Sequence, residues 1–149
     1  MLLSGRPSEF AWCAWSEASA RRLEAPLGCP SGQTTWEYFA LLLALTLWAT
    51  RFRKEGLAVL GDNLSSLNAL LSLKGRNQLS KVTRELAWSK TRYAWRYAAG
   101  HLPSELNTLA DSLSRVAAPA GHAKEVPSEL DGALRRDFPD QDGIWAVPD

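Results

Sequence analysis

A histidine, an asparagine and an aspartate follow one another at intervals of six and four residues in the stretch GHLPSELNTLADSLSR, residues 100–115. They are His101, Asn107 and Asp111. Asn107 can cap a helix because its side-chain oxygen accepts free N–H groups of the first turn, and Asp111 then lies about one turn further along. The pattern predicts a carboxylate near the start of a helix from about Asn107 to Ala117. A structural explanation needs no catalytic role. In it, Asn107 is a helix cap, Asp111 is a first-turn acid that suits the helix dipole, and His101 is a surface histidine.

Two further acids occupy comparable places. Glu37 stands three residues after Thr34, the spacing of a capping box, at the start of a helix expected to run to about Lys54, with Gly56 just beyond it. Asp62 ends the apolar run LAVLGD, which is compatible with a buried parallel strand. Mg²⁺ prefers such oxygen ligands, and two ions about 3.5 to 4 Å apart can activate a water against a phosphodiester. A capping acid and a turn acid are the alternative interpretations.

The expected order of strands and helices makes a mixed α/β layer fold, and these elements would position the candidate residues. The remaining elements follow from hydrophobic periodicity and turn residues. In chain order, we expect a strand at 9–17, its hairpin partner up to Gly28, the helix from Thr34, the strand 57–62, helices at 64–75 and about 77–91, a strand at 93–101 and the last helix. Residues 119–149 are expected to be mostly irregular, with a short helix around SELDGALRR.

Composition limits the class of protein. The chain has 149 residues, 46% of them hydrophobic, which suits one domain with a buried core. Two cysteines without metal-ligand spacing argue for a reducing compartment and against zinc. The longest apolar run, residues 38–49, is too short to cross a bilayer, and no signal-peptide pattern precedes it. We therefore expect an intracellular protein that is not inserted in a membrane.

Basic residues are concentrated in the middle of the chain. Residues 51–100 hold ten Lys or Arg and three Asp or Glu, although the whole chain has a net charge of only +1. Trp88, Tyr93 and Trp95 are interleaved with them, a mixture suited to phosphates and stacked bases. A solvated helix face explains the same charges equally well.

Three segments together resemble the ribonuclease H domain of a retrotransposon reverse transcriptase polyprotein. TTWEYFALLLAL resembles the glutamate-bearing first helix of that family, VLGDN its second-aspartate strand, and GHLPSELNTLADSLSR its closing motif. The resemblance implies an RNase H-like mixed sheet flanked by helices over residues 8–117. Residues 118–149 would then form a mostly irregular Pro-rich and acidic tail or linker.

The resemblance also implies an activity, which is Mg²⁺- or Mn²⁺-dependent hydrolysis of the RNA strand of RNA:DNA hybrids, with two ions in an intact homologue. The implied partners are such hybrids or other nucleic acid and the rest of a larger polyprotein. The implied metal ligands are Glu37, Asp62 and Asp111. His101 would complete the catalytic set by aiding proton transfer or product release. The implied substrate-binding residues are Asn63, Lys81, Arg84 and Asn107.

One part of the family pattern has no counterpart here. The family begins with a central strand that carries the first catalytic aspartate, whereas the first acid of this chain is Glu9. We therefore expect a chain that starts after that strand and is inactive or impaired in isolation. Its hairpin would either pair directly with residues 57–62 or leave hydrogen-bonding edges open in the sheet. The alternatives are a catalytically dead RNase H-like scaffold or nucleic-acid-binding remnant and, less favoured, an unrelated helical interaction domain.

Overall fold

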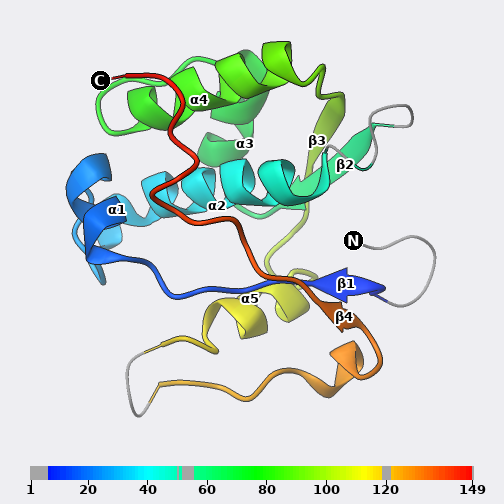
Figure 1. Cartoon of the computed structure of the whole chain (residues 1–149). Helices are drawn as coiled ribbons and strands as arrows, with labels where there is room; N and C mark the ends of the chain where they lie inside the picture. Colours follow the sequence, from blue (N-terminus) through cyan, green and yellow to red (C-terminus); the bar gives the residue numbers. More distant parts are fainter. Residues whose placement is uncertain (1–6, 50, 52–55, 119–121, 149) are drawn as a thin grey trace. The chain divides into compact units, whose positions relative to one another are not determined.

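A computed structural model describes residues 7–49, 51, 56–118 and 122–148 of the chain (Figure 1). These residues form a mixed α/β protein whose contacts divide it into two units. Unit 1 holds residues 1–14 and 103–138, and unit 2 holds residues 15–102 and 139–149. The elements are β1 (Glu9–Phe10), α1 (Glu17–Leu23), a 3₁₀ turn (Pro30–Gly32), α2 (Gln33–Trp48), β2 (Leu57–Gly61), α3 (Leu64–Ser72), α4 (Leu79–Arg92), β3 (Tyr97–His101), α5 (Thr108–Ser114), a second 3₁₀ turn (Ser128–Leu130) and β4 (Leu134–Arg135).

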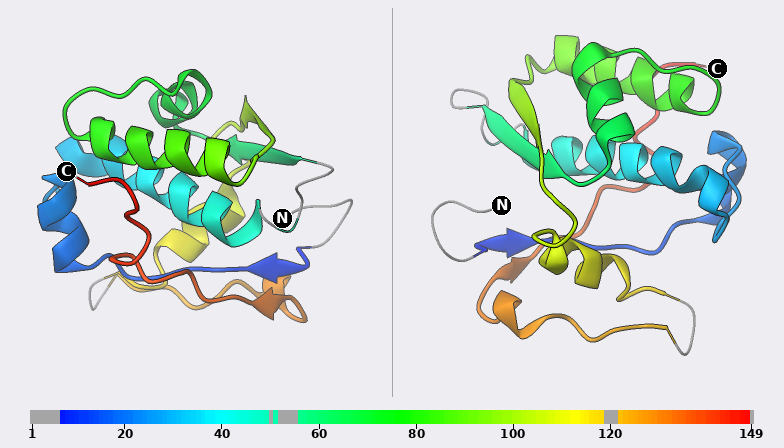
Figure 2. Two further views of the ribbon diagram at one scale, coloured as in Figure 1. Left: turned by 45° about the horizontal axis from the view of Figure 1, so that its top comes forward. Right: turned by 180° about the vertical axis from the view of Figure 1, so that it is seen from behind.

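The core of unit 2 lies among three helices. α2 packs against both α3 and α4, as the views in Figures 1 and 2 show. α2 is apolar on several sides, which is typical of a helix covered by neighbours on more than one face. Its buried side chains include Tyr38, Phe39, Leu42, Leu43 and Leu45. The Tyr38 hydroxyl lies 3.2 Å from the Ala69 carbonyl oxygen of α3 and 3.2 Å from Thr83 Oγ1 of α4, so it joins all three helices.

The sheet of unit 2 is a parallel pair, β2 beside β3. Their register runs from Leu57 opposite Tyr97 to Gly61 opposite His101. Parallel strands require a crossover connection, which α3 and α4 provide. The Tyr97 hydroxyl donates to the Leu70 carbonyl at 3.2 Å, which ties β3 to α3. The LAVLGD run forms a parallel strand as predicted, but the strand is not buried, since its residues are half-buried or exposed and Leu60 is 55% exposed.

Unit 1 is built on a second parallel pair, β1 beside β4. An ion pair extends the pairing, because Arg136 Nη2 lies 2.9 Å from Glu9 Oε1. The Arg135 guanidinium carbon lies 4.6 Å from the centre of the Trp12 ring. Within the expected irregular tail, Leu134 and Arg135 are therefore held in a strand, and the short segment before them is a 3₁₀ turn rather than an α-helix.

The predicted hairpin at residues 9–28 is wrong. Only Glu9 and Phe10 are extended as a strand, and the expected partner is helix α1. Local capping explains the helix, because Ser16 Oγ accepts the N–H of Ser19 at 2.9 Å and Glu24 ends it in the left-handed conformation. The expected pairing of this hairpin with residues 57–62 is also wrong, since the described partner of β2 is β3.

Other boundaries shift by a few residues. α2 ends at Trp48, and most of its predicted extension to Lys54 lies outside the described residues. β3 begins at Tyr97 instead of residue 93, because Tyr93 caps α4 and Ala94 turns the chain with a positive φ of 52°. Cys13 and Cys29 are both free thiols. Among the described residues, none of the helices has both the length and the apolar character needed to cross a membrane.

Candidate functional site

Glu37 lies in the second turn of α2, on the side of the helix that faces the β2–α3 junction. The helix begins at Gln33 after the 3₁₀ turn, with Gly32 at the N-cap position and no side-chain cap. The predicted capping box of Thr34 and Glu37 is therefore wrong. Instead, Gln33 Nε2 donates to Glu37 Oε1 at 3.0 Å, one helical turn away. This leaves the Glu37 carboxylate available for contacts outside its own helix.

The β2–α3 junction supplies the second acid and an amide. Asp62 follows the last residue of β2 and is exposed. Asn63 caps α3, because its Oδ1 accepts the N–H of Ser66 at 3.0 Å. Its Nδ2 donates to Thr34 Oγ1 at 3.4 Å and so ties the start of α3 to the first turn of α2. This link holds the junction beside Glu37.

The two acids also interact electrostatically. Burial raises the pKa of Glu37 above its ordinary value, and the negative charge of Asp62 raises it further. Hydrogen bonds from Gln33 and Asn63 act in the opposite direction. The net result is a half-buried carboxyl that holds its proton more tightly than usual beside a second carboxylate.

His101 reaches the same edge of the sheet from β3. It is in register with Gly61, the residue before Asp62, and the N–H of Leu102 donates to the Gly61 carbonyl at 2.8 Å. The carboxyl ends of parallel strands meet at one edge, which places His101 and Asp62 at that edge together. The His101 side chain is exposed. Unit 2 thus holds three of the predicted residues. Glu37 lies near Asp62 and Asn63, and His101 ends the strand that pairs with β2.

Asp111 and Asn107 belong to unit 1 and to helix α5. Asn107 occupies the predicted N-cap position, but its side chain makes no capping hydrogen bond. The prediction that its side-chain oxygen accepts an N–H of the first turn is therefore wrong. Asp111 Oδ1 accepts from Arg115 at 2.9 Å, and this hydrogen bond lowers the pKa of Asp111. Because the two units are described separately, the convergence of Asp111 with Glu37 and Asp62 stays a prediction.

The carboxylates of Glu37 and Asp62 and the amide oxygen of Asn63 lie near the end of β2. They are oxygen ligands of the kind that a hard divalent cation prefers. No three His, Cys, Asp or Glu side chains within the described ranges are grouped closely enough to hold a metal ion. The described site is therefore a two-carboxylate site.

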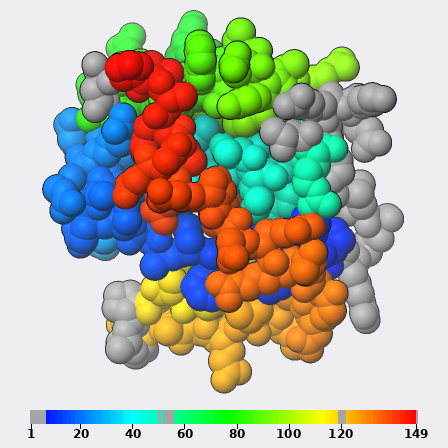
Figure 3. All heavy atoms as spheres, in the orientation of Figure 1, coloured from blue at the N-terminus to red at the C-terminus, as the bar shows by residue number. Residues whose placement is uncertain are grey.

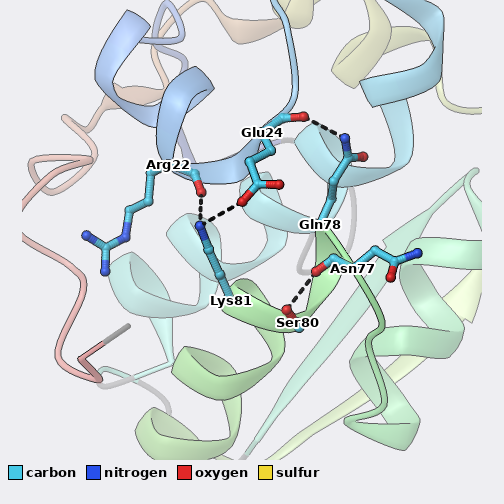
Figure 4. A network of polar contacts seen from close by, with 6 residues as sticks. All are labelled: Arg22, Glu24, Asn77, Gln78, Ser80 and Lys81. Atoms are coloured by element: carbon cyan, nitrogen blue, oxygen red, sulfur yellow. Dashed lines mark hydrogen bonds and ion pairs between the residues drawn. The ribbon is translucent and has the colours of Figure 1, made fainter.

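Lys81 of α4 contacts another helix, whereas Arg84 and Arg92 of α4 are exposed. Lys81 is engaged with α1, because its Nζ donates to the Arg22 carbonyl at 2.7 Å and lies 3.3 Å from Glu24 Oε1 (Figure 4). Gln78 reinforces the same joint by donating to the Glu24 carbonyl. Lys81 therefore fastens two helices together, a role that its sequence context does not signal.

Arg84, Trp88 and Arg92 follow one another at four-residue spacing on α4 and are all exposed, Trp88 by 47%. Residues four apart share one helix face, so these three form a stripe with an aromatic ring between two guanidinium groups. We call it the Arg-Trp-Arg stripe. Trp95, which the sequence suggests as another aromatic contact, is only 3% exposed and belongs to the core.

Comparison with protein-family models, with curated proteins and with solved structures gives no match.

Proposed function

We propose that this chain is an RNase H-like nuclease unit of a retroelement, which hydrolyses the RNA strand of RNA:DNA hybrids with a divalent cation. The observation that carries the proposal is the placement of Asp62 and Glu37, since Asp62 follows a strand of a parallel pair and Asn63 ties that strand end to the first turn of α2, which holds Glu37 one turn further on. The two acids come from segments 25 positions apart in the sequence, yet they share one site. In this proposal the unit works inside the cell as part of a larger reverse transcriptase polyprotein.

The donor set fits Mg²⁺ or Mn²⁺. Glu37 and Asp62 would hold the ion with their carboxylates. Burial raises the pKa of Glu37 most and the charge of Asp62 adds to the effect, and a bound cation would favour the ionised form of both acids. When bound, such an ion makes a water more acidic and stabilises negative charge on phosphate oxygens. Asp111 would join the site as a third carboxylate if α5 packs at the same edge.

The other residues would bind and orient the nucleic acid. His101, exposed at the end of β3, would aid proton transfer during cleavage or the release of the cleaved RNA. The guanidinium groups of Arg84 and Arg92 would contact phosphates, and the ring of Trp88 offers a surface for stacking. Asn63 supports the site through its hydrogen bonds to both neighbouring helices.

Binding of Mn²⁺ tests the site before activity is considered. We expect Mn²⁺ to broaden the NMR signals of Glu37, Asp62 and Asn63 first, and Glu37→Gln or Asp62→Asn to weaken binding at least tenfold. The control is Glu129→Gln, the same chemical change at an exposed acid of unit 1. Equal Mn²⁺ affinity in all three variants would rule out the site.

One observation favours a second function, a scaffold that binds nucleic acid without cutting it. Asp111 is held by Arg115 through both Nε and Nη2, at 3.3 and 2.9 Å, and this partner would have to be displaced before Asp111 could bind a metal ion. Cleavage of a labelled hybrid distinguishes the two functions. Mg²⁺-dependent cleavage that is lost in Asp62→Asn supports the nuclease, whereas tight binding without cleavage supports the scaffold.

A further inference from the structure

A segment far along the chain is docked on the helices of unit 2. Residues 139–149 belong to this unit, although unit 1 separates them in sequence from the rest of it. Figure 3 shows residues 139–148 in orange-red to red on the surface, beside α1 in blue and α4 in green. We call residues 141–147, which carry the contacts described below, the latch segment.

A buried carboxylate holds one end of the latch segment. Glu85 of α4 is 1% exposed, and its two oxygens accept the backbone N–H groups of Ala146 at 3.0 Å and Val147 at 2.6 Å. A buried carboxylate is costly unless hydrogen bonds satisfy it, and bonds to a charged acceptor are the stronger ones. Glu85 therefore recognises two consecutive residues that both have a backbone N–H.

An aromatic clamp holds the residue just before them. The Trp145 ring stacks on Phe39 of α2 with centres 5.3 Å apart and planes 7° from parallel. The guanidinium carbon of Arg22, from α1, lies 4.6 Å from the centre of the same ring. At the other end of the latch segment, Gln141 Oε1 accepts from the Ser16 N–H at 3.2 Å and from Ser19 Oγ at 3.1 Å. Side chains of three helices thus select a glutamine, a tryptophan and two N–H groups.

This arrangement is a peptide-recognition site that holds a segment of its own chain. We propose that the same site accepts the latch segment of a second copy, so that two chains exchange these segments. Exchange preserves every contact described above because the segment and the site keep their sequences. The segment enters from the boundary between Phe138 and Pro139, where the two units meet in sequence. In the proposed exchange the backbone changes direction at this boundary, so that the latch segment leaves unit 2 of its own chain and makes the same contacts with unit 2 of the second copy.

A labelled synthetic peptide of residues 138–148 tests docking from outside. The full chain carrying Trp145→Ala has a weakened latch segment and an intact site, so it should bind the peptide at least tenfold more tightly than the wild-type chain, whose own segment competes. Adding Glu85→Gln should reverse that gain at least tenfold. Glu129→Gln, which makes the same chemical change at an exposed acid of unit 1, should leave binding unchanged. The full chain with Ala146→Pro, which lacks one of the two N–H groups, provides a second weakened latch segment should Trp145→Ala fail to fold.

Peptide variants check the recognition rule. A peptide with Ala146→Pro should not bind, whereas one with Ala146→Gly, which keeps the N–H, should bind as the parent does. Absence of parent peptide binding to a folded Trp145→Ala or Ala146→Pro chain would overturn the proposal.

Exchange between copies is tested by mixing two full-length variants. Trp145→Ala supplies an intact site, and Arg22→Ala/Glu85→Gln supplies an intact latch segment. We expect native mass spectrometry to detect a heterodimer in the mixture and monomers of each variant alone. Peptide binding without a heterodimer would overturn the exchange between copies.

Discussion

The negative charge of Asp62, which follows β2, interacts electrostatically with Glu37 in the second turn of α2. Burial raises the pKa of Glu37, and the charge of Asp62 adds to the effect. Residues that hold a proton more tightly because of a nearby like charge are common at functional sites, where a ligand of opposite charge removes the conflict. Three of our predictions concern this coupling or the surface that would bring substrate to it.

The first prediction concerns the titration of Glu37. Asp62→Asn should lower the pKa of Glu37, because it removes a negative charge that opposes ionisation. Side-chain carbon NMR measures this pKa directly. Gln33→Ala should move it in the other direction, since the hydrogen bond from Gln33 favours the ionised form. A pKa of Glu37 that does not respond to Asp62→Asn would show that the two acids are not coupled in solution.

The second prediction is the pH dependence of stability that follows. A raised pKa in the folded state means that the stabilising contribution of Glu37 is fully present below its ordinary value of 4.5 and is lost as the pH rises through the raised value. Asp62→Asn should reduce this loss. Denaturant unfolding at pH 4 and pH 7 should therefore show a smaller drop in stability for Asp62→Asn than for the wild-type chain, with Glu129→Gln as the matched control.

The third prediction concerns nucleic-acid binding by the Arg-Trp-Arg stripe. Arg84→Ala/Arg92→Ala should weaken binding to an RNA:DNA hybrid and reduce the log–log salt slope by about 0.7 to 0.9 for each phosphate contact removed. Fluorescence anisotropy at several salt concentrations measures both quantities. Trp88→Ala should weaken binding without changing the slope, since stacking releases no counterions.

Lys81→Ala separates this surface from the α1–α4 joint. Because Lys81 is bound to Arg22 and Glu24, its loss should lower the melting temperature more than it changes the salt slope. If Lys81→Ala reduced the salt slope as much as Arg84→Ala does, Lys81 would contact a phosphate, and its assignment to the α1–α4 joint alone would be wrong.

The fourth prediction concerns the tight turn between α3 and α4. A Cβ atom on Gly75 would lie 2.7 Å from the Leu79 carbonyl oxygen and closer still to Thr83 Oγ1. Because the Leu79 oxygen is backbone, the clash is not relieved by a side-chain rotation, and Gly75→Ala should destabilise the chain by about 1 to 3 kcal/mol. Gly61→Ala is the control, since its nearest contact would be an ordinary 3.7 Å from Leu67. Equal midpoints of urea unfolding for the two variants would contradict the prediction.

Sequence reasoning succeeded where apolar periodicity was long and unambiguous. α3 and α4 have apolar residues at helical spacing, and β2 is followed by an acid before a capped helix, so each element and the position of Asp62 could be predicted. The region around α1 could not, because the aromatic residues before it mimic a strand whereas Ser16 and Ser19 form a cap. The docking of Trp145 was also invisible, since its contacts lie more than a hundred residues away from it along the chain.

The alternation of the two units along the chain has a consequence for synthesis on the ribosome. The chain passes from unit 1 to unit 2 after residue 14, returns after residue 102, and enters unit 2 again after residue 138. Domains generally fold as units in the order in which they emerge, but unit 2 cannot close until its last segment has been translated. Until then the Glu85 carboxylate lacks its two N–H donors and Phe39 lacks its stacking partner. A nascent chain stalled before residue 139 should therefore expose this surface to chaperones, and a chain whose residues 139–148 have emerged from the ribosome should conceal it.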